Sequence, residues 1–343
     1  MVANVQEQPV HPLRAVFQDL RITRKGLKVE HTGHYVPLEW ATVVDVVRWL
    51  TYDGALRLVP TLADRPIKIA FTPHTARRWY FARAIVEHLG AEVVEDPADA
   101  ELVWAFDDAT FSDEVMATND QVVINGTCTD ISKTRINEIM QSVFGYALAA
   151  DPETYDGPMV EKSEINGAHD GRIVQGPAPR REGFVYQRLV DNQYDDNRVE
   201  DLRTTIVGGK PVLVFRKRRP MDGRFANTNT EVVLTSLDEV FTMEERNMIG
   251  AFAQELGLDA GGLDVLRDRH TGKLFIVDAN KTDMGPPMAL PLNDKLKATH
   301  MMAEALAEEI QVSYSTSRAA ARTFQMADLQ PFSWKHQIFG QPA

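Results

Sequence analysis

Two apolar runs separated by a polar turn, in the last third of the chain, constrain the fold most strongly. Residues 262–266 and 273–280 flank a polar stretch that contains Gly272, which predicts a β-hairpin. Asp264 and Asp278 are equally far from Thr271, so folding the hairpin places them side by side. Asn280 follows Asp278 by two residues and therefore shares its strand face.

This arrangement brings two carboxylates and one amide to a single surface patch. Oxygen donors of this kind are the ligands of a hard divalent cation, which also keeps water or phosphate oxygens. Neighbouring carboxylates repel each other unless a cation lies between them. The hairpin therefore predicts a Mg²⁺ or Mn²⁺ site formed by Asp264, Asp278 and Asn280.

The composition excludes several classes of protein. The chain has 343 residues, enough for two or three domains, and a formal net charge of −12, which argues against a general role on nucleic acid or at a membrane surface. Its single cysteine, Cys128, rules out an intrachain disulfide. No run approaches roughly 18 apolar residues, and no apolar segment of a secretory signal is visible at the start. We therefore expect a cytoplasmic protein.

The pattern along the chain predicts a mixed α/β architecture. From residue 67, apolar runs at 67–71, 91–94, 102–106 and 122–124 read as strands, with a helix over 75–89, which suggests a small α/β domain with a mostly parallel sheet. A helix over 132–146 follows, and then a strand-rich region. Thr242 and Glu245 form a capping box that opens a helix ended by Gly257. Near the start, Trp40, Val43, Val44, Val47 and Leu50 form a helical apolar face, expected to pack in a core.

Basic residues and glycines suggest where phosphates bind. Lys162 lies in a strand before a loop with two glycines, a loop type that can fold over phosphates, although such loops are also common without this role. His169, within the loop, is the histidine best placed for acid–base chemistry; His270 and His300 read as turn and helix residues.

The run 216–219 is strongly basic in an acidic protein. Alternation places Arg216 and Arg218 on one strand face and Lys217 and Arg219 on the other. One face could pair with phosphate and with a substrate carboxylate; otherwise the run is a charged edge strand.

Taken in order over about residues 120–290, these features resemble the ATP-grasp superfamily, and within it the RimK-like (glutamate-ligase-like) carboxylate–amine ligases. The segment 132–134 resembles the family's first lysine segment, 159–163 the strand of its second lysine, and 166–171 its phosphate loop. The segment 187–190 resembles the adenine hinge, and the hairpin carboxylates with Asn280 match the metal triad.

The resemblance implies specific roles for residues. Nucleotide contacts are expected from Lys133, Lys162, Gly167, Ala168, His169, Asp170, Gly171, Gln187, Arg188, Leu189, Val190, Asp201 and Asn227. Lys162 with Arg216 or Arg218 is expected to steady the transferring phosphoryl group. ATP and Mg²⁺ (with Mn²⁺ as an alternative) are the implied cofactors, and the partners are a small-molecule carboxylate and an amine-type acceptor. A homodimer is common in the family, but the residues do not decide the oligomer.

The resemblance also implies a domain order. We expect an extension over residues 1–65, an α/β domain over 66–130, two ATP-grasp subdomains (131–192 and 193–315) that clamp ATP, and a tail over 316–343. The implied activity is ATP-dependent formation of an acylphosphate, which a nucleophile then attacks. A small-molecule kinase and a non-catalytic nucleotide-binding protein stay open as alternatives. Lys281 and Asp283, just beyond the triad, leave the acceptor class undecided.

Overall fold

The alternating strands and helices of the first half form a parallel sheet, as the pattern predicts. The computed structural model describes residues 20–23, 26–29, 35–36, 39–118, 120–168, 170–226 and 229–311. The parallel sheet has the order β5-β4-β6-β7. Its elements are β4 (Lys68–Pro73), α3 (Phe81–Leu89), β5 (Glu92–Val93), β6 (Leu102–Phe106) and β7 (Val122–Ile124). Helix α2 (Trp40–Leu56) and a small antiparallel sheet precede them, the latter formed by β1 (Leu20–Thr23), β2 (Gly26–Val29) and β3 (Tyr35–Val36).

Two further antiparallel sheets follow in the rest of the described chain. A three-stranded sheet of order β10-β8-β9 consists of β8 (Gly157–Ser163), β9 (Arg172–Gly176) and β10 (Phe184–Arg188), and α4 (Lys133–Phe144) precedes it. A five-stranded sheet of order β13-β12-β11-β14-β15 contains β11 (Arg198–Val207), β12 (Lys210–Pro220), β13 (Glu231–Thr235), β14 (Ala260–Arg267) and β15 (Leu274–Asn280). The α/β fold class, with parallel and antiparallel sheets, is therefore confirmed.

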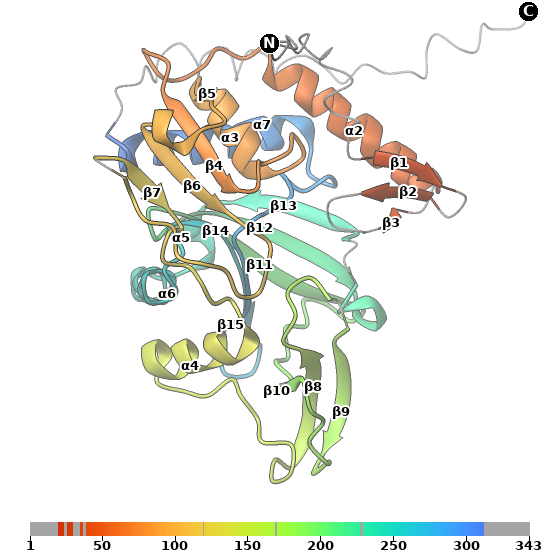
Figure 1. The fold of residues 1–343 in the computed structure, drawn as a ribbon. Coiled ribbons are helices and arrows are strands. Elements are labelled where there is room, and N and C mark those ends of the chain that lie inside the picture. Colours follow the sequence, from red (N-terminus) through yellow and green to blue (C-terminus); the bar gives the residue numbers. More distant parts are fainter. Residues whose placement is uncertain are drawn as a thin grey trace, which may run out of the picture.

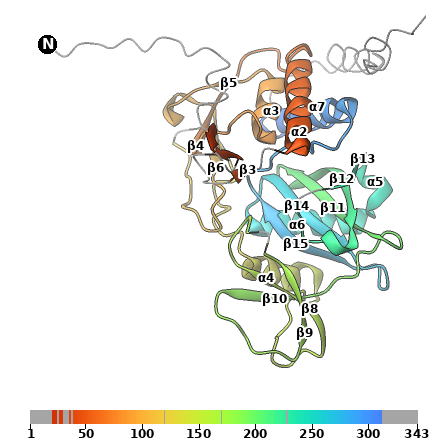
Figure 2. The ribbon, with the colours of Figure 1, turned by 90° about the vertical axis from the view of Figure 1, so that its right-hand side faces the viewer.

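The five-stranded sheet lies in the middle of the molecule (Figures 1 and 2). One of its faces shares a core with the parallel sheet, α2, α3 and α7 (Leu292–Glu309), the last helix of the described residues. Leu213 and Phe215 belong to this core. The other face packs against α4 and α6 (Met243–Leu256), with the short α5 (Leu237–Val240) at its edge, and Val214 belongs to this second core. Since Val214 and Phe215 are adjacent, β12 alternates between two buried faces, and this alternation decides which of its basic residues meet the site.

Two expectations from the sequence are wrong. The apolar face of α2 does not pack in a core, because Trp40 is 80 % exposed and Val47 is 56 % exposed, whereas the buried side of the helix carries Tyr52 and Leu56. The helix expected from residue 75 begins only at Phe81.

The late start of α3 has a tertiary cause. Residues 79–81 pair with the segment that follows β15: the Phe81 N–H donates to the Asp283 carbonyl at 2.8 Å, and the Gly285 N–H donates to the Trp79 carbonyl at 3.2 Å. Tyr80 also forms a β-bridge with Met284. This pairing holds Tyr80 in an extended conformation, so the helix cannot begin earlier.

Among the described residues, no helix combines the length and apolar character needed to cross a membrane.

Candidate functional site

The hairpin of β14 and β15 brings its two carboxylates together. Asp264 is the register partner of Asp278, and a bulge follows directly after Asp264, between it and Val265. The predicted pairing is thus confirmed. Asn280 lies opposite Gly262 on the same hairpin, but its side-chain oxygen already accepts the Thr282 N–H at 2.8 Å.

A buried arginine holds the first carboxylate. An Arg203 guanidinium nitrogen lies 3.0 Å from the Asp264 carboxylate, and the same side chain also pairs with Asp283. Burial alone would raise the pKa of Asp264, but Arg203 and Lys217 outweigh it and lower that pKa to about 2. Asp264 is therefore a fixed negative charge at any physiological pH, which suits a cation ligand.

Two lysines converge on the second carboxylate. The Lys133 ammonium nitrogen lies 3.5 Å from an Asp278 carboxylate oxygen, and the Lys162 ammonium donates to the neighbouring Val277 carbonyl at 2.8 Å. Burial lowers the pKa of Lys162, nearby Lys133 lowers it further, and Asp278 opposes both. The lysines come from α4 and β8, which are distant in sequence from the hairpin, so the fold itself assembles this group of charges.

These charges line a pocket between the two antiparallel sheets, close to the N-terminus of α4. Most residues expected from the sequence to contact a nucleotide lie along its wall: Lys133, Lys162, Gly167, Ala168, Asp170, Gly171, Gln187, Arg188, Leu189, Val190 and Asp201, together with Asp264 and Asp278. His169 and Asn227 lie outside the described residues. The wall also contains Arg219, from the basic run, and residues that sequence reasoning missed, among them Asn192, Arg224, Phe225, Leu266 and Val277.

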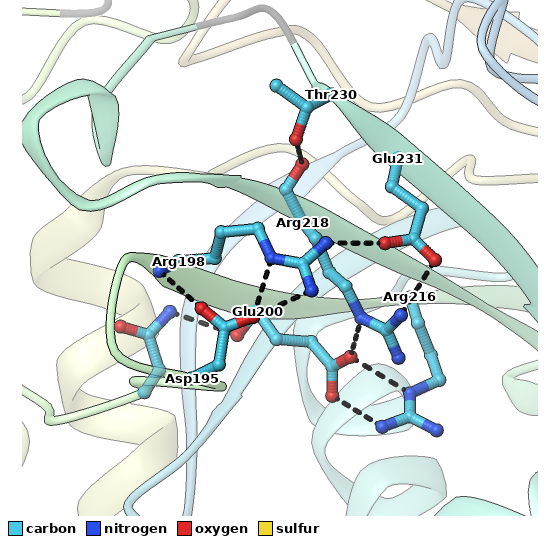
Figure 3. Close-up of polar contacts among 8 residues, drawn as sticks. Asp195, Arg198, Glu200, Arg216, Arg218, Thr230 and Glu231 are labelled. Atoms are coloured by element: carbon cyan, nitrogen blue, oxygen red, sulfur yellow. Dashed lines mark hydrogen bonds and ion pairs between the residues drawn. The ribbon is translucent and has the colours of Figure 1, made fainter.

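Two arginines expected to act in catalysis lie outside this pocket. Arg216 and Arg218 both pair with Glu200, and Arg218 also pairs with Glu231 (Figure 3). The guanidinium of Arg218 further lies over the Tyr194 ring, 3.8 Å from its centroid. Both arginines lie on the same face of β12 as Val214, the face that packs toward α4 and α6. There, Glu200 and Glu231 pair with their charges, away from the hairpin.

The other face of the same strand points toward the site. The charge of Lys217 acts directly on Asp264, Arg203 and Asp283, and burial lowers the pKa of Lys217. Arg219 lines the pocket and pairs with Asp201. Burial raises the pKa of Asp201 to about 6, with Arg219 opposing this shift. Of the basic run 216–219, Arg219 lines the pocket, and Lys217 shares its strand face.

The donors fit a divalent cation together with phosphate. Within the described ranges, no group of three or more His, Cys, Asp or Glu side chains is arranged to hold a metal ion. The hairpin instead offers two adjacent carboxylates, and each of them lies beside a cationic side chain, Arg203 at Asp264 and Lys133 at Asp278. Such a set suits Mg²⁺, which keeps several water or phosphate oxygens and needs only one or two carboxylates from the protein.

Comparison with known proteins adds structural similarity only. No protein-family model and no curated protein matches the chain. Solved structures do match it. They include the ATP-grasp ligase PsnB with a phosphomimetic variant of its minimal precursor, Mg and ADP (TM-score 0.48, 10 % identity, covering 71 % of this chain and 99 % of that one). A RimK domain ATP-grasp protein from Sphaerobacter thermophilus DSM 20745 also matches (0.43, 12 %, 71 % and 99 %), as does the ATP-bound D-alanine–D-alanine ligase of Bacillus anthracis (0.39, 11 %, 76 % and 99 %). The chain is thus similar in structure, at low identity, to solved ATP-grasp ligases.

Proposed function

We propose that this protein is an ATP-dependent ligase that activates a substrate carboxylate as an acylphosphate. The observation that carries the proposal is the convergence of Lys133 and Lys162 on the Asp264–Asp278 pair, within a pocket whose wall includes a glycine-containing loop. A nucleoside triphosphate with its Mg²⁺ requires cations and loop N–H groups for the phosphates and carboxylates for the metal ion. Bound there, Mg²⁺ would neutralise phosphate charge.

The position of each pocket residue determines the role that we assign to it. Leu189, Val190 and Leu266 offer an apolar surface and hinge backbone to the base, while Lys133 and Lys162 hold phosphates. A substrate carboxylate oxygen attacks the γ-phosphorus, and the bond to the β,γ-bridging oxygen breaks, which gives an acylphosphate and ADP. An amine then attacks the acyl carbon, loses a proton and expels phosphate. Lys217 and Arg219, on the pocket side of β12, would stabilise the transferring group electrostatically.

Calorimetric titration with Mg·ATP tests the nucleotide and metal assignments. We expect wild-type protein to bind, and Asp278→Asn to lose affinity by about 10–100-fold, because it loses a metal-ligating charge. Asp99→Asn, at an exposed position in the first domain, is the matched control and should bind as wild type does. Equal binding by wild type and Asp278→Asn, or no binding by either, would overturn the metal assignment.

Hydroxylamine trapping distinguishes a ligase from the alternatives. With Mg·ATP, hydroxylamine and a panel of small polar acids, a ligase releases ADP and forms a hydroxamate from the acylphosphate. ADP release with a stable phosphate ester and no hydroxamate would identify a kinase. ATP binding without turnover across a wide panel would identify a nucleotide-binding protein.

A further inference from the structure

The base of the phosphate loop is attached to the N-terminus of α4 by one carboxylate. Glu164, directly after β8, accepts the Lys133 N–H at 2.8 Å and the Thr134 N–H at 3.3 Å, and it also accepts the Thr134 hydroxyl. Loop and helix are far apart in sequence, so nothing local requires this contact.

The contact completes the hydrogen bonding of the helix end. The first N–H groups of a helix have no partners within it, and they carry a partial positive charge that favours an anion. Ser132 caps the Arg135 N–H through its hydroxyl at 3.1 Å. Glu164 takes the two preceding N–H groups. With these groups satisfied by the protein, α4 offers a ligand the side chain of Lys133 rather than its backbone.

Lys133 is held at both ends as a result. Its backbone N–H is bound by Glu164, and its ammonium donates to the Ile165 carbonyl at 3.3 Å while lying 3.5 Å from Asp278. The side chain is only 4 % exposed. A long flexible side chain loses considerable rotamer freedom in such a position, so the residues that orient it contribute to any ligand it binds.

We propose that Glu164 is a positioning residue that fastens the phosphate loop to α4 and thereby keeps the Lys133 ammonium beside Asp278. Glu164 needs no contact with nucleotide for this role, because it acts through Lys133. The inference rests on the proposed function, since it concerns the same nucleotide pocket.

Binding of Mg·AMP-PNP, measured by calorimetry, tests the role. We expect Glu164→Ala to weaken binding by about tenfold, because a set of charge-assisted hydrogen bonds is removed, and Glu164→Gln to fall between it and wild type, since the amide oxygen still accepts one N–H. Glu138→Ala, at an exposed glutamate on the same helix that pairs with Arg135, is the matched control and should leave affinity unchanged.

A double-mutant cycle separates positioning from general destabilisation. If Glu164 acts through Lys133, the double variant Glu164→Ala/Lys133→Gln loses no more affinity than Lys133→Gln alone. Additive losses, or a Glu164→Ala protein that binds like wild type, would overturn the inference while leaving the nucleotide site in place. Failure of wild type to bind Mg·AMP-PNP would instead refute the proposed function.

Discussion

At the scale of single residues, strand alternation decides which basic side chain serves the pocket. The four basic residues 216–219 have nearly the same chemistry, yet Arg216 and Arg218 pair with carboxylates on one face, and Lys217 and Arg219 lie beside Asp264 and Asp201 on the other. The alternation was predictable from the sequence. The choice of face was not, because distant helices determine what covers each side of β12.

This difference predicts opposite outcomes for two neighbouring substitutions. Lys217→Gln should slow hydroxamate formation by about 10²–10³-fold, since it removes electrostatic stabilisation of the transferring group. Arg216→Gln should leave the rate nearly unchanged and lower the free energy of unfolding by less than about 1 kcal/mol, because a partly exposed ion pair contributes little. Trapping assays and urea unfolding measure both; equal rate losses in the two variants would contradict the assignment.

At the scale of elements, the sequence predicted helices and strands well where capping or turn residues mark their ends. The capping box of Thr242 and Glu245 and the left-handed Gly257 bound α6 as the sequence indicated. The hairpin register of Asp264 and Asp278 followed equally from spacing. Helix α3 starts later than its pattern suggested, because Tyr80 pairs with Met284, more than 200 residues away in the chain. Local rules cannot anticipate such a partner.

Loss of the α6 cap should destabilise the fold measurably. Thr242→Ala removes the side chain that accepts the Glu245 N–H at 3.2 Å, and we expect the free energy of unfolding to fall by about 1 kcal/mol. Thr242→Ser keeps the hydroxyl and should retain most of the stability. Urea unfolding of the three proteins gives the comparison, and identical midpoints for Ala and Ser would show that the cap is not used.

At the scale of the whole molecule, two buried histidines join helix α3 to helix α7, elements about 200 residues apart in the chain. His88 of α3 and His300 of α7 share a hydrogen bond of 3.0 Å between ring nitrogens, and His300 lies 3.3 Å from Glu304. Burial, with a smaller contribution from His300, lowers the pKa of His88 to about 4. No sequence pattern indicated this pair, because the partners are joined only through packing of α3 on α7.

The lowered pKa of His88 makes the free energy of unfolding depend on pH. Between about pH 6.5 and 4 the unfolded chain binds a proton at His88 that the folded protein does not, so the free energy of unfolding falls as the pH falls, by up to about 3 kcal/mol. In His88→Gln this part of the slope should disappear. Urea unfolding of both proteins across this range measures it, and parallel stability curves would refute the assignment.

The pairing of residues 79–81 with 283–285 has a consequence for exchanging parts of this protein with another. The segment after the hairpin is held by backbone hydrogen bonds of Phe81 and Gly285 with residues 283 and 79. Lys281 is anchored in addition on the Ser112 hydroxyl at 2.6 Å. A copy of this segment transferred from another protein would lack its own pairing partner, the stretch that corresponds to residues 79–81. In the ligase proposed above, a change of acceptor preference through this segment should therefore require residues 79–81 and 283–285 to be exchanged together.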